Sequence, residues 1–108
     1  MAATATQKAL APDPVKADSK HYKVEFENDK VRVLRVKYGP REKSPMHSHP
    51  EIVAVLLSPH HSRHSFPDGR VQDMHGKPGD VLHMEATEHS PENATDSPME
   101  LILVELKR

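Results

Sequence analysis

Short runs of alternating apolar and polar residues fill most of the chain after residue 21. A period of two is typical of β-strands that bury one face. Alternation and β-branched content predict strands at the following positions: 22–27, 31–38, 52–57, 63–66, 70–75, 81–84 and 99–106. The run 52–57, IVAVLL, is apolar at every position, as is typical of a strand between two layers. No segment has the period of a convincing amphipathic helix.

Turn residues separate these runs at intervals of about eight to twelve residues. The strongest turn signals are Asn28-Asp29, Pro67-Asp68-Gly69 and the segment 76–80. Roughly eight short strands in this spacing predict an all-β fold, either an antiparallel sandwich or a barrel. An immunoglobulin-like sandwich is disfavoured, because such a core uses Trp or an aromatic cluster and this chain has no Trp, two Tyr and two Phe.

The length of 108 residues predicts one domain. Residues 1–20 are rich in Ala, Thr and Lys and have prolines at 12 and 14, so we expect them to bury little apolar surface. This composition predicts a flexible arm or an extended strand docked on a partner subunit. The folded domain is expected at 21–108.

No apolar run approaches the roughly 20 residues of a membrane span, and the N-terminus lacks the apolar centre of a signal peptide. Ala9-Leu10-Ala11 resembles a cleavage site, so the compartment stays open, with the cytoplasm as the default.

Composition narrows the possible partners and chemistry. The formal net charge is -1 and no basic stripe is present, so nucleic acid is not an expected partner. The chain has no cysteine, which excludes disulfides, thiolate metal sites and a cysteine nucleophile. A transition metal must therefore use nitrogen and oxygen ligands, and the chain has nine histidines.

The stretch PMHSHPE holds His47 and His49 two residues apart between prolines. Side chains two apart in an extended segment point to the same side, so both imidazoles can reach one point. This pair predicts half of a metal site.

Several motifs together resemble the cupin family. Its first motif is G-x5-HxH-x3,4-E-x6-G and its second ends in H-x3-N, and the resemblance covers residues 22–107. The matching positions are Gly39, His47-Ser48-His49, Phe66-Pro67-Asp68-Gly69, Pro78-Gly79-Asp80-Val81 and His89-Ser90-Pro91-Glu92-Asn93. The resemblance implies a double-stranded β-helix, the cupin jelly-roll barrel, that is often a homodimer and holds a divalent metal. It places His47, His49 and His89 on the three histidine ligand positions.

The chain departs from the cupin pattern at the acidic ligand. The motif positions for glutamate hold Val53 and Ala54, and Gly39 stands two residues further from the first histidine than the pattern asks. Glu51 has the strand parity of the histidine pair, but Pro50 intervenes and the spacing is short. The predicted site is therefore a three-histidine face, which iron, zinc, nickel, copper and manganese all accept.

The other histidines have competing interpretations. His64 shares a strand face with Phe66, so it is expected inside the barrel as a structural residue, a fourth ligand or a group that supports a ligand. His83, on the strand before His89, has the same alternatives, and Glu51 is a further candidate fourth ligand. His60 and His61 are predicted in an exposed hairpin loop. No role is expected for two remaining histidines, His21 and His75.

Three neutral ligands leave the full charge of a divalent ion uncompensated, which favours an anionic, chelating guest. A thiolate, the enolate of a β-diketone or a 2-hydroxy acid fits this description. The arrangement is similar to that of three-histidine cupin dioxygenases, so one hypothesis is a metal-dependent oxidoreductase of dioxygenase type, or a lyase. The alternative is a module that binds metal or a small ligand without turnover. The apolar wall of the pocket is expected from Val53, Val55, Leu57 and Met84.

Overall fold

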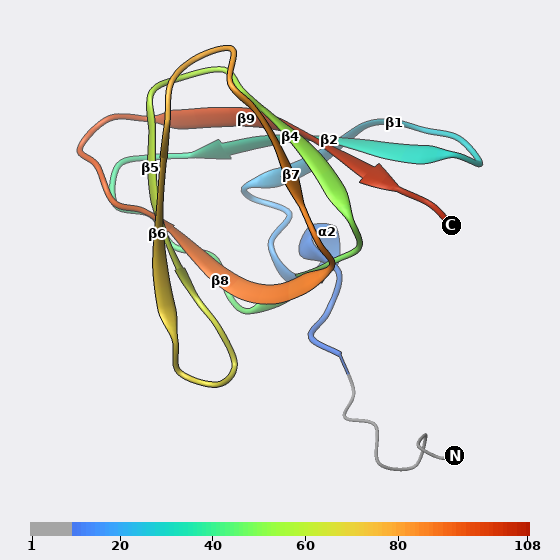
Figure 1. The fold of residues 1–108 in the computed structure, drawn as a ribbon, viewed down its shortest axis with the longest axis horizontal. Coiled ribbons are helices and arrows are strands. Elements are labelled where there is room, and N and C mark those ends of the chain that lie inside the picture. The colour runs from blue at the N-terminus through green and yellow to red at the C-terminus, as the bar shows by residue number, and fades with distance from the viewer. Residues whose placement is uncertain (1–9) are drawn as a thin grey trace.

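The computed structural model describes residues 10–108 (Figure 1). One helical turn, α2 (Pro14–Ala17), precedes the strands. The strands of the described part are β1 (Tyr22–Glu27), β2 (Val31–Tyr38), β3 (His47–His49), β4 (Ile52–Leu56), β5 (His60–Ser65), β6 (Val71–Gly76), β7 (Val81–Met84), β8 (Thr87–Asn93) and β9 (Met99–Leu106).

The strands form two antiparallel sheets that enclose one interior (Figure 1). One sheet has five strands in the order β1-β2-β9-β4-β7, and the other has four in the order β3-β8-β5-β6. Sequence neighbours are often not sheet neighbours, as where β9 lies between β2 and β4. The predicted all-β, antiparallel architecture is confirmed.

Two segments of the four-stranded sheet differ from the sequence expectation. Strand β5 begins at His60, three residues earlier than predicted, so the expected hairpin loop at 60–61 is part of the sheet. Strand β8 forms in a polar stretch where alternation predicts no strand. Its buried positions include His89 and Asn93 rather than aliphatic residues, so the hydrophobic signal of a strand is missing.

The apolar core lies on the inner face of the five-stranded sheet. Strand β4 contributes Ile52, Ala54 and Leu56, each 1% exposed, while Val53 and Val55 are half-buried on the other face. The expected pocket wall of Val53, Val55 and Leu57 is therefore wrong, although Met84 does line the interior. Alternation cannot choose a face in a run that is apolar throughout, and here the pairing with β7 and β9 decides. The core residues are Tyr22, Leu34, Val36, Tyr38, Ile52, Ala54, Leu56, Met99, Leu101 and Leu103.

The segment before β1 packs against strand β3 of its own chain. Asp13 caps α2 by accepting hydrogen bonds from the backbone N–H groups of Val15 and Lys16. Ser48 donates from its backbone N–H to Pro12 O and from its hydroxyl to Ala11 O. The described part of the expected arm thus lies along the strand that carries the histidine pair; residues 1–9 of that arm fall outside the described residues.

Candidate metal centre

The inner face of the four-stranded sheet is lined with imidazoles and hydroxyls instead of aliphatic side chains. Because β3, β8 and β5 are neighbours, their inward-facing positions form one polar surface opposite the apolar core. Its buried members are His47, His49, His60, Ser62, His64 and His89. Buried polar groups must be hydrogen-bonded or hold a ligand, so the partners of each one define what the site can do.

Strands β3 and β8 bring His47, His49 and His89 together. His47 and His89 are direct partners in the antiparallel register, where the side chains of such a pair are adjacent. All three are buried, and one nitrogen from each lies within 4.8 Å of the others. The residues that the sequence named as metal ligands therefore form a single cluster.

The outer nitrogens of the β3 pair show which inner nitrogens are free. His47 Nδ1–H donates to Pro45 O at 2.9 Å, and His49 Nδ1–H donates to Glu105 Oε2 at 3.2 Å. A carbonyl and an ionised carboxylate only accept, so both Nδ1 atoms carry the proton. Each neutral ring then presents a lone pair at Nε2, the form in which imidazole binds a metal.

The inner nitrogens of the cluster fit a cation between them. His47 Nε2 and His49 Nε2 are 3.1 Å apart, yet neither has a proton to donate. The third inner nitrogen, His89 Nε2, is buried without a hydrogen-bond partner. Metal–nitrogen bonds of about 2.1 Å at octahedral to tetrahedral angles put two ligand nitrogens about 3.0–3.4 Å apart. The donor set and the spacing of the His47–His49 pair therefore match a divalent transition metal.

Burial keeps His47 and His89 in their neutral form. It lowers the pKa of His89 to about 2, with His64, His49 and His47 as neighbouring imidazoles that add to the effect. Burial also lowers the pKa of His47 to about 4, again with the nearby His49 contributing. Protons therefore do not compete for these lone pairs near neutral pH.

Sequence reasoning missed Glu105, the carboxylate that orients His49. Its side chain is buried and also accepts a hydrogen bond from Arg32 Nε at 2.7 Å. Burial acts to raise the pKa of Glu105, but the bonds from His49 and Arg32 outweigh it and the pKa is lowered. A signal was present: Glu105 has the same strand parity as Met99 and Leu103, so an acid stands on the core face of β9.

The three candidates for a fourth ligand lie elsewhere. Glu51 is paired with His83 at 2.6 Å and with Arg108, so its carboxylate is already paired outside the cluster, and His83 is half-exposed. His64 is buried as expected from its parity with Phe66. It contacts Nδ1 of His89 rather than joining the ligand nitrogens, so it supports a ligand.

Two histidines differ from expectation in their burial. His60, predicted on an exposed loop, is only 7% exposed because β5 starts at this residue and places it on the same face as Ser62 and His64. His21, for which no role was expected, is buried between two carboxylates: Asp18 contacts its Nδ1 and Glu42 its Nε2. It thereby ties the segment before β1 to the barrel.

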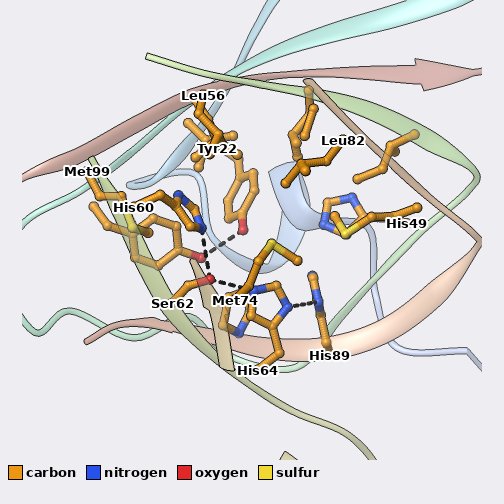
Figure 2. A pocket seen from close by; sticks show the side chains of 18 residues that line it. Tyr22, His49, Leu56, His60, Ser62, His64, Met74, Leu82, His89 and Met99 are labelled. Atoms are coloured by element: carbon orange, nitrogen blue, oxygen red, sulfur yellow. Dashed lines mark hydrogen bonds between the residues drawn. The ribbon is translucent and has the colours of Figure 1, made fainter. Parts of the chain in front are cut away.

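Two spaces that could hold a small ligand adjoin His64 and His89. An interior cavity of about 40 Å³ reaches from these residues to Leu56 and Met99 (Figure 2). A wider hollow of about 440 Å³ borders the same two histidines from outside. Its wall holds no Lys or Arg among the described residues and consists of His64, Phe66, Gln72, Met74, Leu82, His83, Met84, Glu85, Ala86, Thr87 and His89.

Comparison with known proteins identifies the fold. No family model and no curated protein matches the sequence. Among solved structures, a cupin domain from Bordetella pertussis Tohama I is similar with a TM-score of 0.75 and 19% identity, over 94% of this chain and 100% of that one. The protein is therefore a cupin-fold barrel, a double-stranded β-helix with a three-histidine group that can hold a metal ion.

Two similar structures belong to enzymes. The polyketide cyclase RemF from Streptomyces resistomycificus has a TM-score of 0.59 and 16% identity, over 81% of this chain and 64% of that one. The lyase DddQ, a DMSP lyase from Ruegeria pomeroyi, has a TM-score of 0.57 and 14% identity, over 82% of this chain and 48% of that one. In residues 10–108, no helix has the length and apolar content needed to cross a membrane.

Proposed function

We propose that His47, His49 and His89 bind a divalent transition metal and that the protein is a metal-dependent enzyme of dioxygenase or lyase type. The observation that carries the metal site is the convergence of three imidazole nitrogens: two unprotonated ones face each other at 3.1 Å, and the third is buried without a partner. A cation at this point would satisfy all three at once. Iron, zinc, nickel, copper and manganese all suit an all-imidazole face.

The charge of the centre favours an anionic, chelating substrate. The three ligands are neutral, and the nearest buried carboxylate, Glu105, contacts the outer nitrogen of His49 and is also paired with Arg32. A bound divalent ion would act as a Lewis acid that polarises and orients a β-diketone enolate, a thiolate or a 2-hydroxy acid. An anion at the open positions would reduce the net charge inside the barrel.

The chain's own residues would bind and shield such a substrate. Phe66, Met74, Leu82 and Met84 form an apolar wall of the outer hollow, which would pack against the carbon skeleton and limit access of water. Gln72 is a neutral hydrogen-bonding group on the same wall. Arg41 precedes the histidine pair, but it is paired with Asp96 and is not among the residues that line this hollow.

A non-catalytic metal or small-ligand binding module is the second candidate. It is favoured by the size of the inner cavity, about 40 Å³, which holds one or two water molecules rather than a substrate. A substrate would therefore have to occupy the outer hollow. RemF and DddQ carry an enzymatic function on a similar fold, but fold likeness alone does not transfer an activity.

Metal analysis tests the proposed metal site. Untagged protein would be purified, stripped with a chelator, and titrated with Fe²⁺, Zn²⁺, Ni²⁺, Cu²⁺ and Mn²⁺. We expect one equivalent to bind tightly, and His89→Ala to weaken binding at least about 100-fold while the fold is kept. His83→Ala is the matched control, because His83 is exposed and outside the cluster. Equal binding by wild type and His89→Ala would refute the ligand set.

Catalysis is tested on the metal-loaded protein. Oxygen uptake with β-diketones and thiols, and product analysis with 2-hydroxy acids, would detect a dioxygenase or a lyase. Tight metal binding without turnover of any of these classes would favour the binding module. The homodimer and the cytoplasmic location remain predictions, which sedimentation analysis and cell fractionation would test.

A further inference from the structure

A continuous row of hydrogen bonds connects His89 with the opposite side of the barrel interior (Figure 2). His89 Nδ1 and His64 Nδ1 are 3.0 Å apart. His64 Nε2 is 2.9 Å from Ser62 Oγ, and Ser62 Oγ is 2.9 Å from His60 Nε2. The last three residues alternate along β5, so one strand supplies the whole row beyond His89.

The two ends of this row are unusual atoms. Across residues 10–108, two buried side-chain nitrogen or oxygen atoms have no hydrogen-bond partner, and they are His89 Nε2 and His60 Nδ1. Every atom between them is paired. An unpartnered buried polar atom is destabilising, so each end is suited to an occupant. At the His89 end the occupant is the proposed metal; at the His60 end none has been assigned.

Among the described residues Ser62 Oγ has hydrogen-bond partners only in His60 and His64, so its hydroxyl proton is donated within the row. The row can then point in only two directions when its imidazoles are neutral. In the first, His89 Nδ1–H donates to His64, His64 Nε2–H donates to Ser62, and the Ser62 hydroxyl donates to His60 Nε2. His60 must then carry its proton on Nδ1, while His89 Nε2 has a lone pair. In the second, every bond is reversed, so that His89 Nε2 carries a proton and His60 Nδ1 has the lone pair.

Only the first direction is compatible with a metal on His89. Changing from the second direction to the first releases one proton from His89 Nε2 and takes up one at His60 Nδ1, so every ring stays neutral. A cation at one end therefore makes the other end a hydrogen-bond donor. Since an acceptor at His60 favours the same direction, the two occupants must strengthen each other's binding.

We propose that His60 Nδ1–H is a second binding site, for an oxygen atom that accepts a hydrogen bond, and that the row His64–Ser62–His60 couples this site to the metal centre. The coupling rests on the proposed metal function. His60 and His89 line the same inner cavity of about 40 Å³, which admits a water molecule or a small carboxylate such as formate. His64 and Ser62 are thus positioning residues that hold His89 in its metal-binding tautomer.

The tautomer of His60 is the direct test. Full-length protein labelled with ¹⁵N-histidine would be studied by NMR, metal-free and with one equivalent of Zn²⁺. In the zinc-loaded protein His60 should be protonated at Nδ1 and unprotonated at Nε2. Protonation at Nε2 with zinc bound would overturn the proposal, because the row would then point the wrong way.

Ser62→Ala interrupts the row without touching a metal ligand. We expect it to weaken Zn²⁺ binding by about 10-fold or more and to leave the tautomer of His60 independent of zinc. Ser65→Ala is the matched control on the same strand, because the side chain of Ser65 is outside the row; it should bind zinc as wild type does. Wild-type zinc affinity in a folded Ser62→Ala variant would refute the coupling.

Formate distinguishes the sources of the acceptor oxygen. An increase in zinc affinity on adding formate that His60→Phe abolishes would place the carboxylate at His60. An equal increase in both proteins would place formate on the zinc and leave water as the occupant of the second site.

Failure of the metal proposal would be recognised separately: wild-type protein would not bind Zn²⁺, but His60 and His89 should still share one tautomer, both Nδ1–H or both Nε2–H. A mixed pair in the metal-free protein would refute the row itself.

Discussion

Mild acid should destabilise the metal-free protein strongly, because its interior holds histidines in the neutral form. Burial lowers the pKa of His47 and His64 to about 4 and that of His89 to about 2. In the unfolded chain these groups titrate near 6.5. Between these values the unfolded chain binds more protons than the folded one, so the free energy of unfolding falls as the pH falls.

The size of the effect follows from three groups. Lowering the pH from 7.5 to 5.5 reduces the free energy of unfolding by about 1.4 kcal/mol for each group whose pKa in the folded protein stays below the final pH. His47, His64 and His89 together therefore cost about 4 kcal/mol. Burial also lowers the pKa of His60, which acts in the same direction. A small domain is stable by about 5–15 kcal/mol, so much of its stability would be lost.

Urea unfolding in the presence of EDTA measures this loss. Circular dichroism would follow the transition at pH 7.5 and 5.5, with the free energies extrapolated to water. His89→Gln should reduce the difference between the two pH values by about one third, whereas Ser65→Ala, which removes no titrating group, should leave it unchanged. A loss below about 1 kcal/mol in the wild type would show that the interior histidines take up protons in the folded protein, and the neutral cluster would be refuted.

Four further substitutions, one of them a matched control, test the supports of the site and the core. Glu105→Gln removes the charge that accepts the proton of His49 Nδ1; zinc affinity in a chelator competition assay should fall about 10-fold or more, and unchanged affinity would contradict the orienting role. Gly76→Ala should lower the free energy of unfolding by about 1–3 kcal/mol, because its Cβ would lie 2.3 Å from Cδ1 of buried Leu56. Gly69→Ala meets no atom within 4 Å but has a φ of +90°, so its cost in urea unfolding is backbone strain of about 1 kcal/mol; an equal cost for both would argue against the clash. Leu34→Ala, at a fully buried position of β2, should cost about 2–5 kcal/mol in thermal or urea unfolding, and a cost below about 1 kcal/mol would place Leu34 outside the core.

Local sequence determined which segments form strands with one apolar face. It also determined that the side chains of His47 and His49 point to the same side. Alternation is a local property, so it survives in any fold that keeps the segment extended. The run 99–106 shows this most clearly, because its odd-numbered positions are all buried in β9. His89 came from the resemblance of separate motifs, since nothing local links it to a pair 40 residues earlier.

Tertiary structure decided which faces point inward and which histidines meet. In 52–57 both faces are apolar, and the register with β7 and β9 selects Ile52, Ala54 and Leu56. The burial of His60 and the contact of His64 with His89 depend on β5 pairing with β8. Such pairings join residues far apart in the chain, so their energy is shared between strands and is not encoded in the pattern of either one.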